Sequence, residues 1–600
     1  MRHPRAQALG DFTADSRTIP ISLLAILIGV LSTGVAWALL RLIGLFTNLF
    51  YYHRWNFQLV SPAGNHLGPW AILVPIAGAL VIGLMARYGS ERIRGHGIPE
   101  AIESILINGS RVQPRLAILK PLSSAISIGS GGPFGAEGPI IMTGGAFGSM
   151  IAQFFHLTSA ERKTLLVAGA AAGMSATFAS PVAAVLLSVE LLLFEWKPRS
   201  LVPVALASAA AGAARRYILG LGPLFPVPNH PSFIGPEGLL GCAICGLLAG
   251  ALSVLLTGAV YAAEDAFAKL PIHWMWWPAI GGLVVGAGGL VFPQALGVGY
   301  DTIGALLQGN VVTGTIVGIL LVKSVIWAVS LGSGTSGGVL APLLMMGGAL
   351  GGIETMFLPN LGGGFWPLVS MGAILGGTMR SPLTGIIFAL ELTHDINVLL
   401  PLLVASVIAH AFTVLVLKRS ILTEKVARRG YHLSREYAVD PLEILFVRDA
   451  MRTNLVAFSS DNTLDQVRTS LNAQRGTRGQ HLYPVVDEKR HLYGVITRKQ
   501  LHKFLADPKP ARRTLADLAT DPLVAYPDEP LRVVVYRMAE SGLTRFPVVD
   551  RGDHRKLVGM IGLRDLLSAR ARNLEEERNR ERVLRIRLPV LGSEPRQTSV

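Results

Sequence analysis

Cysteine and charged residues are both scarce in this sequence. Two cysteines among 600 residues exclude a disulfide-bonded scaffold. Charged residues make up 16% of the chain and hydrophobic residues 50%. A soluble domain carries about 25% charged residues, so a wholly soluble protein is excluded. The sequence also lacks phosphate-binding loops, catalytic metal motifs and nucleophile motifs, and we therefore expect neither an enzyme nor a required cofactor.

Acidic residues are rarest in the first two thirds of the chain. Residues 20–420 hold 14 of the 39 acidic residues, and residues 421–600 hold 23. This contrast indicates a membrane region followed by a charged soluble module. The net charge of +15 comes without a basic tract interleaved with aromatics, which argues against nucleic acid as a partner. Basic residues flank the first and last apolar runs, so the positive-inside rule predicts that both termini are cytoplasmic.

Five apolar runs are long enough to cross, or nearly cross, a lipid bilayer. They are 21–50, 70–85, 239–261, 274–291 and 399–417. Shorter apolar stretches at 101–108, 140–155 and 341–352 are broken by glycine and proline. Non-helical backbone at membrane depth must be buried in protein or line a water-filled path. Broken helices of this kind favour a transporter or channel, and we expect a multi-pass protein of the cell (inner) membrane.

The membrane region contains an internal repeat. Gly129–Pro139 recurs as Gly332–Pro342 at a constant offset of 203 residues. A Ser-Pro pair followed nine residues after its proline by a glutamate also occurs twice, ending at Glu190 and Glu391, and we expect structural roles for both glutamates. We predict an all-α membrane domain with two halves, about 70–215 and 275–417, related by the inverted topology that is common among transporters.

Three Gly-rich segments end in proline at the predicted start of a helix. They are Gly95–Pro99, Gly135–Pro139 and Gly338–Pro342. A helix N-terminus presents unpaired N–H groups and a positive dipole end, and glycine before it allows a ligand to approach closely. Three such ends converging near the bilayer midplane would bind a small inorganic anion weakly enough to release it.

Glu137 is a carboxylate inside this predicted anion site. An ionisable residue at membrane depth marks a functional site by default. We expect its side chain to occupy an anion position and to block the path until protonation or an arriving anion displaces it. The alternative is a glutamate in a surface loop.

These motifs resemble those of the CLC family of chloride channels and chloride/proton exchangers. The three segments match the family signatures G-S-G-I-P, G-K/R-E-G-P and G-x-F-x-P, in that order. The resemblance covers essentially the whole membrane region. It implies a homodimer in which each subunit has its own anion pathway, with Glu137 as the gate and Lys120 making the interior electropositive. The anion-binding positions that it implies are His96, Gly97, Ile98, Pro99, Gly138, Val339, Leu340 and Leu422.

Four positions depart from the family pattern. His96 replaces a serine and Leu422 a tyrosine, so both side-chain hydroxyls of the usual chloride site are missing, and Leu340 replaces a phenylalanine. Leu191 stands where exchangers carry a second glutamate. We therefore favour a passive voltage- or pH-dependent channel for chloride or a related anion. The alternative is an anion/proton antiporter whose proton route uses Glu195 or His96.

The last third of the chain contains a second, shorter repeat. Residues 483–487 (Y-P-V-V-D) recur as 546–550 (F-P-V-V-D), and each copy is typical of a compact α/β unit. The pattern resembles a pair of cystathionine-β-synthase-type (CBS) domains, which implies a possible adenine nucleotide (ATP or AMP) site. Each copy keeps half of the family's ribose-binding pattern, Thr497 in the first and Asp565 in the second. A purely structural role for the pair is the alternative.

The predicted order of domains runs from membrane to cytoplasm. A cytoplasmic segment (1–19), a CLC-type membrane domain (20–430), a linker (431–444), CBS domain 1 (445–507), CBS domain 2 (508–572) and a charged tail (573–600) follow one another. A CBS-regulated cation channel is the rival from another class, but it would need clustered acids or carbonyl rings at its constriction. A membrane-anchored sensor without transport would need only unbroken spans.

Overall fold

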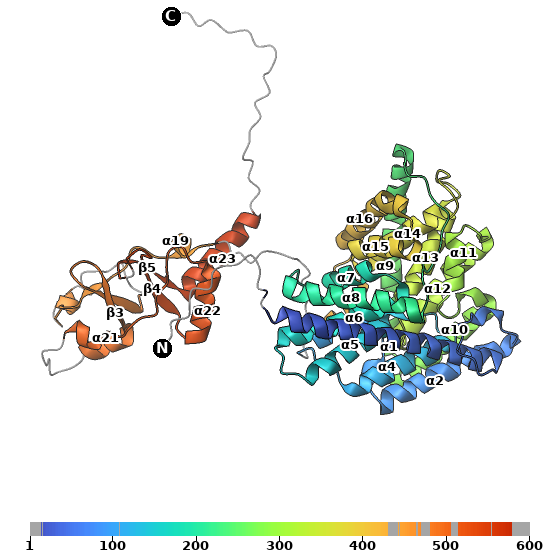
Figure 1. Ribbon diagram of the computed structural model, residues 1–600, viewed down its shortest axis with the longest axis horizontal. Coiled ribbons are helices and arrows are strands. Elements are labelled where there is room, and N and C mark those ends of the chain that lie inside the picture. The colour runs from blue at the N-terminus through green and yellow to red at the C-terminus, as the bar shows by residue number, and fades with distance from the viewer. Residues whose placement is uncertain are drawn as a thin grey trace, which may run out of the picture. The chain divides into compact units, whose positions relative to one another are not determined.

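Two units make up the chain in the computed structural model (Figure 1). They comprise Met1–Glu436 and Tyr437–Val600. The structure describes residues 14, 16–106, 109–429, 442, 445–463, 466–469, 480–505, 514–553 and 555–578. Most of the predicted cytoplasmic segment 1–19, the predicted linker 431–444 apart from residue 442, and the predicted tail beyond residue 578 lie outside the described residues.

Helices build the first unit, as the sequence predicts. Six helical stretches among the described residues are long and apolar enough to cross a membrane, and they are Thr18–Tyr52, Gly68–Tyr88, Pro236–Ala268, Trp274–Val291, Thr313–Gly332 and Ile396–Arg428. Five of them contain the five predicted runs. The span at 313–332 is additional, because Lys323 interrupts its apolar sequence.

The long spans alternate with shorter helices. The helices of this unit are α1 (Thr18–Tyr52), α2 (Leu73–Tyr88), α3 (Ile98–Leu106), α4 (Pro114–Gly129), α5 (Glu137–Gln153), α6 (Ser159–Phe178), α7 (Pro181–Leu187), α8 (Pro198–Ile218), α9 (Pro236–Ala268), α10 (Trp277–Val291), α11 (Tyr300–Leu307), α12 (Thr313–Gly332), α13 (Leu340–Glu354), α14 (Phe365–Met379), α15 (Pro382–Thr393), α16 (Leu399–Val416) and α17 (Ile421–Arg428). A π-helical turn, Ser188–Leu193, extends α7.

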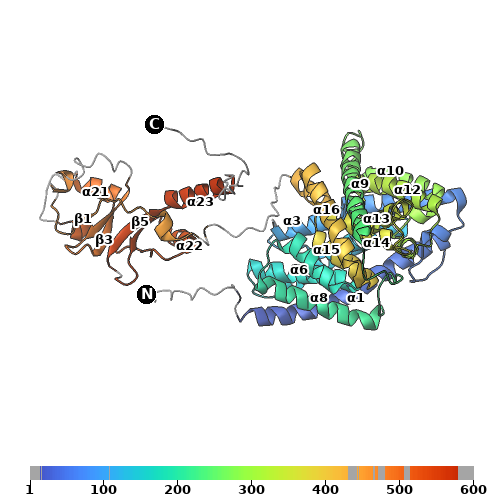
Figure 2. The same ribbon diagram turned by 90° about the horizontal axis from the view of Figure 1, so that it is seen from above.

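Short helices form the buried centre of this unit. α5 packs against α6, and α13 packs in the same way against α14. Most residues of these four helices are buried, whereas α1 exposes apolar side chains such as Leu23 and Leu27. α1 lies alongside α8 in both views (Figures 1 and 2). Close packing needs glycine at the centre, because a Cβ at Gly144 would collide with the Gly169 backbone.

The repeat halves cap each other's helices. The Glu391 carboxylate accepts the N–H groups of Val182 and Ala183 at the start of α7, at 2.9 and 2.8 Å. The Glu190 carboxylate accepts those of residues 383 and 384 at the start of α15, at 3.3 and 2.9 Å. Reciprocal bonds between equivalent residues are what a pseudo-two-fold axis produces. Both glutamates therefore have the structural role expected from the sequence.

Two small sheets characterise the second unit. β1 (Phe458–Ser459), β2 (Leu482–Val486) and β3 (Leu492–Thr497) form the first, in which β1 is parallel and β3 antiparallel to β2. β4 (Arg545–Val549) and β5 (Leu557–Gly562) form an antiparallel pair. The helices are α19 (Val447–Ala450), α21 (Arg498–Leu505), α22 (Leu531–Ser541) and α23 (Leu563–Arg578). The repeated V-V-D sequences lie at equivalent places, at the ends of β2 and β4, as expected for two α/β copies.

Candidate anion-binding site

Three broken segments meet in the middle of the membrane unit. The Gly135 N–H donates to the Gly338 carbonyl at 3.3 Å, and the Gly338 N–H donates to the Gly135 carbonyl at 2.9 Å. The Gly95 N–H donates to the Thr335 carbonyl at 3.1 Å. These loops immediately precede α3, α5 and α13. The three helix N-termini therefore lie side by side, which is the arrangement that suits a small anion.

Two glycines allow the first and second segments to cross. Gly97 has a φ of +90°, which L side chains rarely adopt, and a Cβ there would collide with the Gly138 carbonyl. A Cβ at Gly138 would in turn collide with the carbonyl oxygen of His96. These signature glycines are therefore required by the contact between the loops, in addition to any part in ligand approach.

The predicted anion-binding residues are all buried. His96 exposes 2% of its surface, and Ile98, Val339, Leu340 and Leu422 expose none. Leu422 lies in the first turn of α17, which packs against α3 and α14. The structure thus brings the three Gly-rich segments into direct contact and places the fourth predicted position in a helix that packs on the first of them.

Glu137 closes the space at these helix ends. Its side chain is fully buried, and Oε1 accepts the Ala341 N–H in the first turn of α13 at 3.1 Å. Oε2 has no hydrogen-bond partner among the described residues. The carboxylate therefore takes an N–H group at which an anion would otherwise bind. This geometry is the one expected if the side chain and the anion compete for a single position.

Lys120 clamps two of the loops together. Its buried ammonium donates to the Ile93 and Gly95 carbonyls, each at 2.8 Å, and to Ser336 Oγ at 3.2 Å. The lysine thus joins the loop before α3 to the loop before α13. That Lys120 makes the pathway electropositive stays a prediction, but its ammonium group also has a structural role, which is to hold the two loops together.

Lys323 is a second buried lysine that the motif analysis does not single out. It donates to the carbonyls of Ala295 and Gly297 at 2.9 and 2.8 Å, in the loop before α11. It lies 203 residues after Lys120, the same offset as the Gly-rich repeat. A comparison of single charged residues at this offset would have identified Lys323 from the sequence.

Glu100 is another residue that the signatures do not mark. Its Oε2 accepts the Gly97 N–H at 2.9 Å, and its Oε1 lies 3.6 Å from Lys425 Nζ and 3.2 Å from an Arg429 nitrogen. Glu100 thereby caps α3 and links it to α17. His96 lies within electrostatic reach of this group, and its Nδ1 has no hydrogen-bond partner in the described part of the chain. The sequence signal that could have identified Glu100 is a glutamate in the first turn of a predicted helix.

The membrane unit matches a known family. Residues 77–414 fit the model described as voltage gated chloride channel, which is more than half of the chain. The chain belongs to the CLC family. Residues 447–507 and 515–572 each match the CBS domain model. Both predicted resemblances are thus confirmed, and this CLC chain belongs among membrane proteins that transport anions.

Curated bacterial proteins are similar to this CLC chain over most of their own length. The ClcB-like chloride channel protein of Ralstonia nicotianae is 31% identical over 351 residues, 56% of this chain and 82% of the relative. The H(+)/Cl(−) exchange transporter ClcA of Vibrio campbellii is 32% identical over 367 residues, 58% of this chain and 77% of the relative. The exchange transporter ClcA of Yersinia pestis is 30% identical over 343 residues, 54% of this chain and 70% of the relative.

Solved CLC structures share the fold. A slow cyanobacterial Cl−/H+ antiporter covers 70% of this chain and 99% of its own, with 21% identity and a TM-score of 0.59. A eukaryotic CLC transporter covers 92% of this chain and 98% of its own, with 19% identity and a TM-score of 0.57. These matches confirm the predicted helical CLC fold, and the two CBS-domain matches confirm the α/β pair that follows it.

The position of the exchangers' second glutamate offers no titratable group in this CLC protein. Leu191 is fully buried. Glu195, one of the two predicted substitutes, accepts a hydrogen bond from Ser200 at 2.7 Å and lies 3.1 Å from Lys163 Nζ and 3.5 Å from Lys197 Nζ. The Glu195 charge is therefore held by neighbouring cations, whereas His96 is buried among the residues of the predicted anion site.

Thr497 and Asp565 hold different positions of the repeated motif in the two CBS copies, because Thr497 corresponds to Gly562 and Asp565 corresponds to Gln500. Thr497 donates through Oγ1 to Gln500 Oε1 at 2.6 Å at the start of α21. Asp565 accepts the Gly562 N–H at 2.9 Å at the start of α23, and it also accepts a bond from Arg452 Nε at 2.7 Å. Both residues thus take part in helix capping. Nucleotide binding here stays a prediction, and a ribose would have to displace Arg452.

Proposed function

We propose that this CLC protein exchanges a small inorganic anion, chloride or a related ion, for protons across the membrane, with Glu137 as the gate. The observation that carries the proposal is the bond from the Ala341 N–H to the Glu137 carboxylate at the N-terminus of α13. Relatives named H(+)/Cl(−) exchange transporters support exchange. Passive conduction, which the sequence favours because of Leu191, becomes the second candidate, and the relative named a chloride channel protein supports it.

Competition between a carboxylate and an anion provides the coupling. Ionised Glu137 occupies the α13 N-terminus and excludes an anion from the N–H groups there. When the carboxyl takes up a proton it loses its charge and its attraction to the helix end, so an anion enters in its place. Release of the proton restores the charge, and the carboxylate then displaces the anion. Each cycle therefore links one protonation of Glu137 to the occupation of the site by an anion.

His96 is our candidate for the group that passes protons to the gate. An imidazole can carry a proton on either ring nitrogen, and Nδ1 of His96 is buried with no hydrogen-bond partner among the described residues. Its backbone carbonyl lies against Gly138, the residue that follows Glu137. Glu195 is less suited, because Lys163 and Ser200 engage its carboxylate.

The location, orientation, oligomeric state and nucleotide binding of the protein are also part of the proposal. We place it in the cell (inner) membrane with both termini in the cytoplasm, as a homodimer with one pathway in each subunit. The basic residues that flank the first and last spans support this orientation. The CBS pair would bind an adenine nucleotide through Thr497 and Asp565. The match of both copies to the CBS model supports that assignment.

Liposome flux with simultaneous pH recording tests the function. Purified full-length protein is reconstituted, and a chloride gradient is applied at a clamped voltage. Exchange predicts uphill proton movement driven by chloride, and Glu137→Gln should abolish it while chloride still moves. Chloride movement without protons in the native protein would establish the channel instead. Movement of cations alone would refute the anion site.

Matched variants separate the gate from the proton route. His96→Asn removes the titratable ring while keeping a polar side chain, and it should slow proton movement more than chloride movement. Glu91→Gln changes an exposed glutamate whose only described ion pair is with Arg94, so it should leave both fluxes unchanged. Equal loss of chloride and proton movement in His96→Asn would assign the residue to the anion site alone.

A further inference from the structure

A fourth loop of the membrane unit is built like the first anion segment. Gly297–Tyr300 corresponds to Gly95–Ile98 at an offset of 202 residues. Both loops carry two glycines with positive φ, 89° and 90° in the first and 63° and 78° in the second. Each loop leads directly into a short helix, α3 or α11. Each is also held by a buried lysine that donates to two of its carbonyls. The second loop therefore occupies the place that the repeat assigns to an anion loop.

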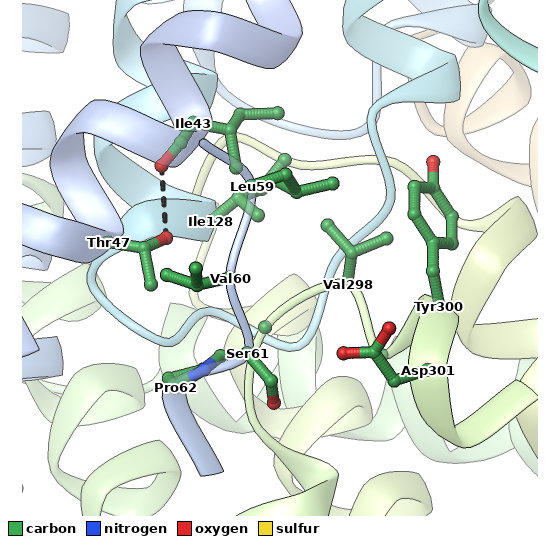
Figure 3. A pocket seen from close by; sticks show the side chains of 12 residues that line it. Ile43, Thr47, Leu59, Val60, Ser61, Pro62, Ile128, Val298, Tyr300 and Asp301 are labelled. Atoms are coloured by element: carbon green, nitrogen blue, oxygen red, sulfur yellow. Dashed lines mark hydrogen bonds between the residues drawn. The ribbon is translucent and has the colours of Figure 1, made fainter. Parts of the chain in front are cut away.

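A cavity lies against this fourth loop (Figure 3). Its volume is about 60 Å³. One buried water needs only about 10–15 Å³, so the cavity has room for water beside the loop. Residues from α1, from the stretch 59–62 and from 297–301 line it. The Tyr300 ring forms one wall, and Figure 3 shows its hydroxyl pointing away from Asp301. The Asp301 carboxylate and the Tyr300 hydroxyl therefore point in different directions.

Two polar atoms near this loop lack hydrogen-bond partners. Tyr300 Oη and Glu137 Oε2 are both buried, and neither has a partner among the described residues. Tyr300 is the first residue of α11, which packs against α13, and the first turn of α13 donates the Ala341 N–H to the Glu137 carboxylate. Buried polar groups are nearly always satisfied in native proteins. A phenol can donate a hydrogen bond, whereas an ionised carboxylate and an inorganic anion only accept one. The unpaired Tyr300 hydroxyl can therefore donate to the Glu137 carboxylate or to the anion that competes with it.

We propose that Tyr300 is an anion ligand whose hydroxyl donates a hydrogen bond to the anion that displaces the Glu137 carboxylate. The inference rests on the proposed function, because it requires an anion in the pathway. It supplies a side-chain hydroxyl to a site in which His96 and Leu422 supply none. The hydroxyl comes from the second half of the repeat, opposite the loop that carries His96.

Aromatic packing holds the hydroxyl in place for this task. The Tyr300 ring meets Phe178 edge-on at 6.4 Å between centroids and lies 6.0 Å from the Phe225 ring. A ring held by two neighbours loses little freedom when an anion binds. Asp301 is exposed at the cavity and repels anions, so the bound anion lies on the hydroxyl side of the ring rather than beside the carboxylate.

Chloride binding to the purified full-length protein tests the inference. Calorimetric titrations are made in the Glu137→Gln background, where no carboxylate competes for the site. We expect Tyr300→Phe to weaken chloride binding about tenfold or more, the loss of one hydrogen bond to a charged group. Tyr51→Phe is the matched control, because the Tyr51 hydroxyl already donates to the Ser130 carbonyl at 3.0 Å, and its chloride affinity should match that of the background.

The outcomes separate this inference from the proposed function. Equal chloride affinity with and without the Tyr300 hydroxyl in the Glu137→Gln background overturns the inference, even if Tyr300→Phe alters flux in the native background. Tyr300→His keeps a donor and should restore part of the affinity, which also covers the case of a phenylalanine variant that fails to fold. Absence of both chloride binding and chloride flux in the parent proteins would refute the proposed function instead.

Discussion

Replacing Lys120 or Lys323 by methionine tests whether the buried lysines hold the broken loops. Each ammonium donates two hydrogen bonds of 2.8–2.9 Å to carbonyl groups of the loop before a short helix, α3 for Lys120 and α11 for Lys323. Methionine keeps the length of the apolar stem but offers no donor. Lys323→Met therefore leaves two buried carbonyl groups without their donor. Lys120→Met removes the short bonds to two others, of which the Gly95 carbonyl keeps a bond of 3.4 Å from the Gly337 N–H.

The expected loss of stability follows from these two bonds. An unpaired buried carbonyl destabilises the folded state by about 1–3 kcal/mol, so two of them amount to about 2–6 kcal/mol. Removal of a buried charge relieves a desolvation penalty and offsets part of this loss. We therefore expect each variant to lower the free energy of unfolding by about 2–3 kcal/mol. The two effects should be similar, because the bond of 3.2 Å to Ser336 Oγ that Lys120→Met also removes offsets the bond that the Gly95 carbonyl keeps.

Equilibrium unfolding of the full-length protein in detergent, followed by tryptophan fluorescence, measures this loss. Lys269→Met is the control, because Lys269 is exposed at the end of α9, and its effect should stay within about 0.5 kcal/mol. A free energy of unfolding unchanged in both buried-lysine variants would refute the clamp. A large loss in Lys120→Met alone would refute the equivalence of the two loops.

Four further variants probe other contacts, three in the membrane unit and one in the CBS unit. Gly138→Ala should destabilise by about 1–3 kcal/mol and abolish chloride flux, because its Cβ would collide with a backbone carbonyl of the neighbouring loop. Glu190→Gln and Glu391→Gln should each lower the free energy of unfolding by about 1–2 kcal/mol, since each carboxylate caps a helix of the other half. A hydrogen bond from Arg551 lowers the pKa of the Asp528 carboxyl. The pair therefore stabilises the CBS unit at neutral pH, and this contribution is lost as the pH falls through the lowered pKa. Asp528→Asn should accordingly weaken the acid dependence of unfolding.

For each of these variants, one result would contradict the expectation. Gly34→Ala is the control for the glycine, because nothing lies within 4 Å of a Cβ there, and equal flux in the two variants would count against the loop crossing. A loss in only one of the two capping variants would contradict reciprocal capping. An unfolding curve of Asp528→Asn identical to that of the parent from neutral to acid pH would show that its ion pair is too exposed to contribute.

Local signals in the sequence were sufficient for the centre of the site. Glycines before a proline at a helix start define where backbone N–H groups are unpaired, and this property depends on only a few neighbouring residues. The segment around Glu137 and its repeat mate could therefore be predicted without any tertiary information. The contact between Gly97 and Gly138 could not, because it joins two loops whose approach depends on the packing of whole helices.

Other parts of the site were missed for definite reasons. α12 is apolar enough to span a membrane, but Lys323 divides it into two apolar runs that are each too short to cross a bilayer on their own. The loop at Gly297–Tyr300 lacks the proline of its mate, and its offset differs by one residue from that of the main repeat. At Thr497 and Asp565, the residues that would bind a ribose are the same types that cap a helix, and only the hydrogen bonds distinguish the two uses.

Reciprocal capping by Glu190 and Glu391 has a consequence for the origin of the chain. A polypeptide with only one half of the membrane unit would carry an uncapped helix and a half-buried carboxylate that lacks its donors from the other half. Two copies of such a half, related by a two-fold axis, would satisfy each other. A half-length ancestor that formed dimers could thus already have contained these contacts. Fusion of two duplicated genes would then turn a subunit interface into the interior of a single subunit.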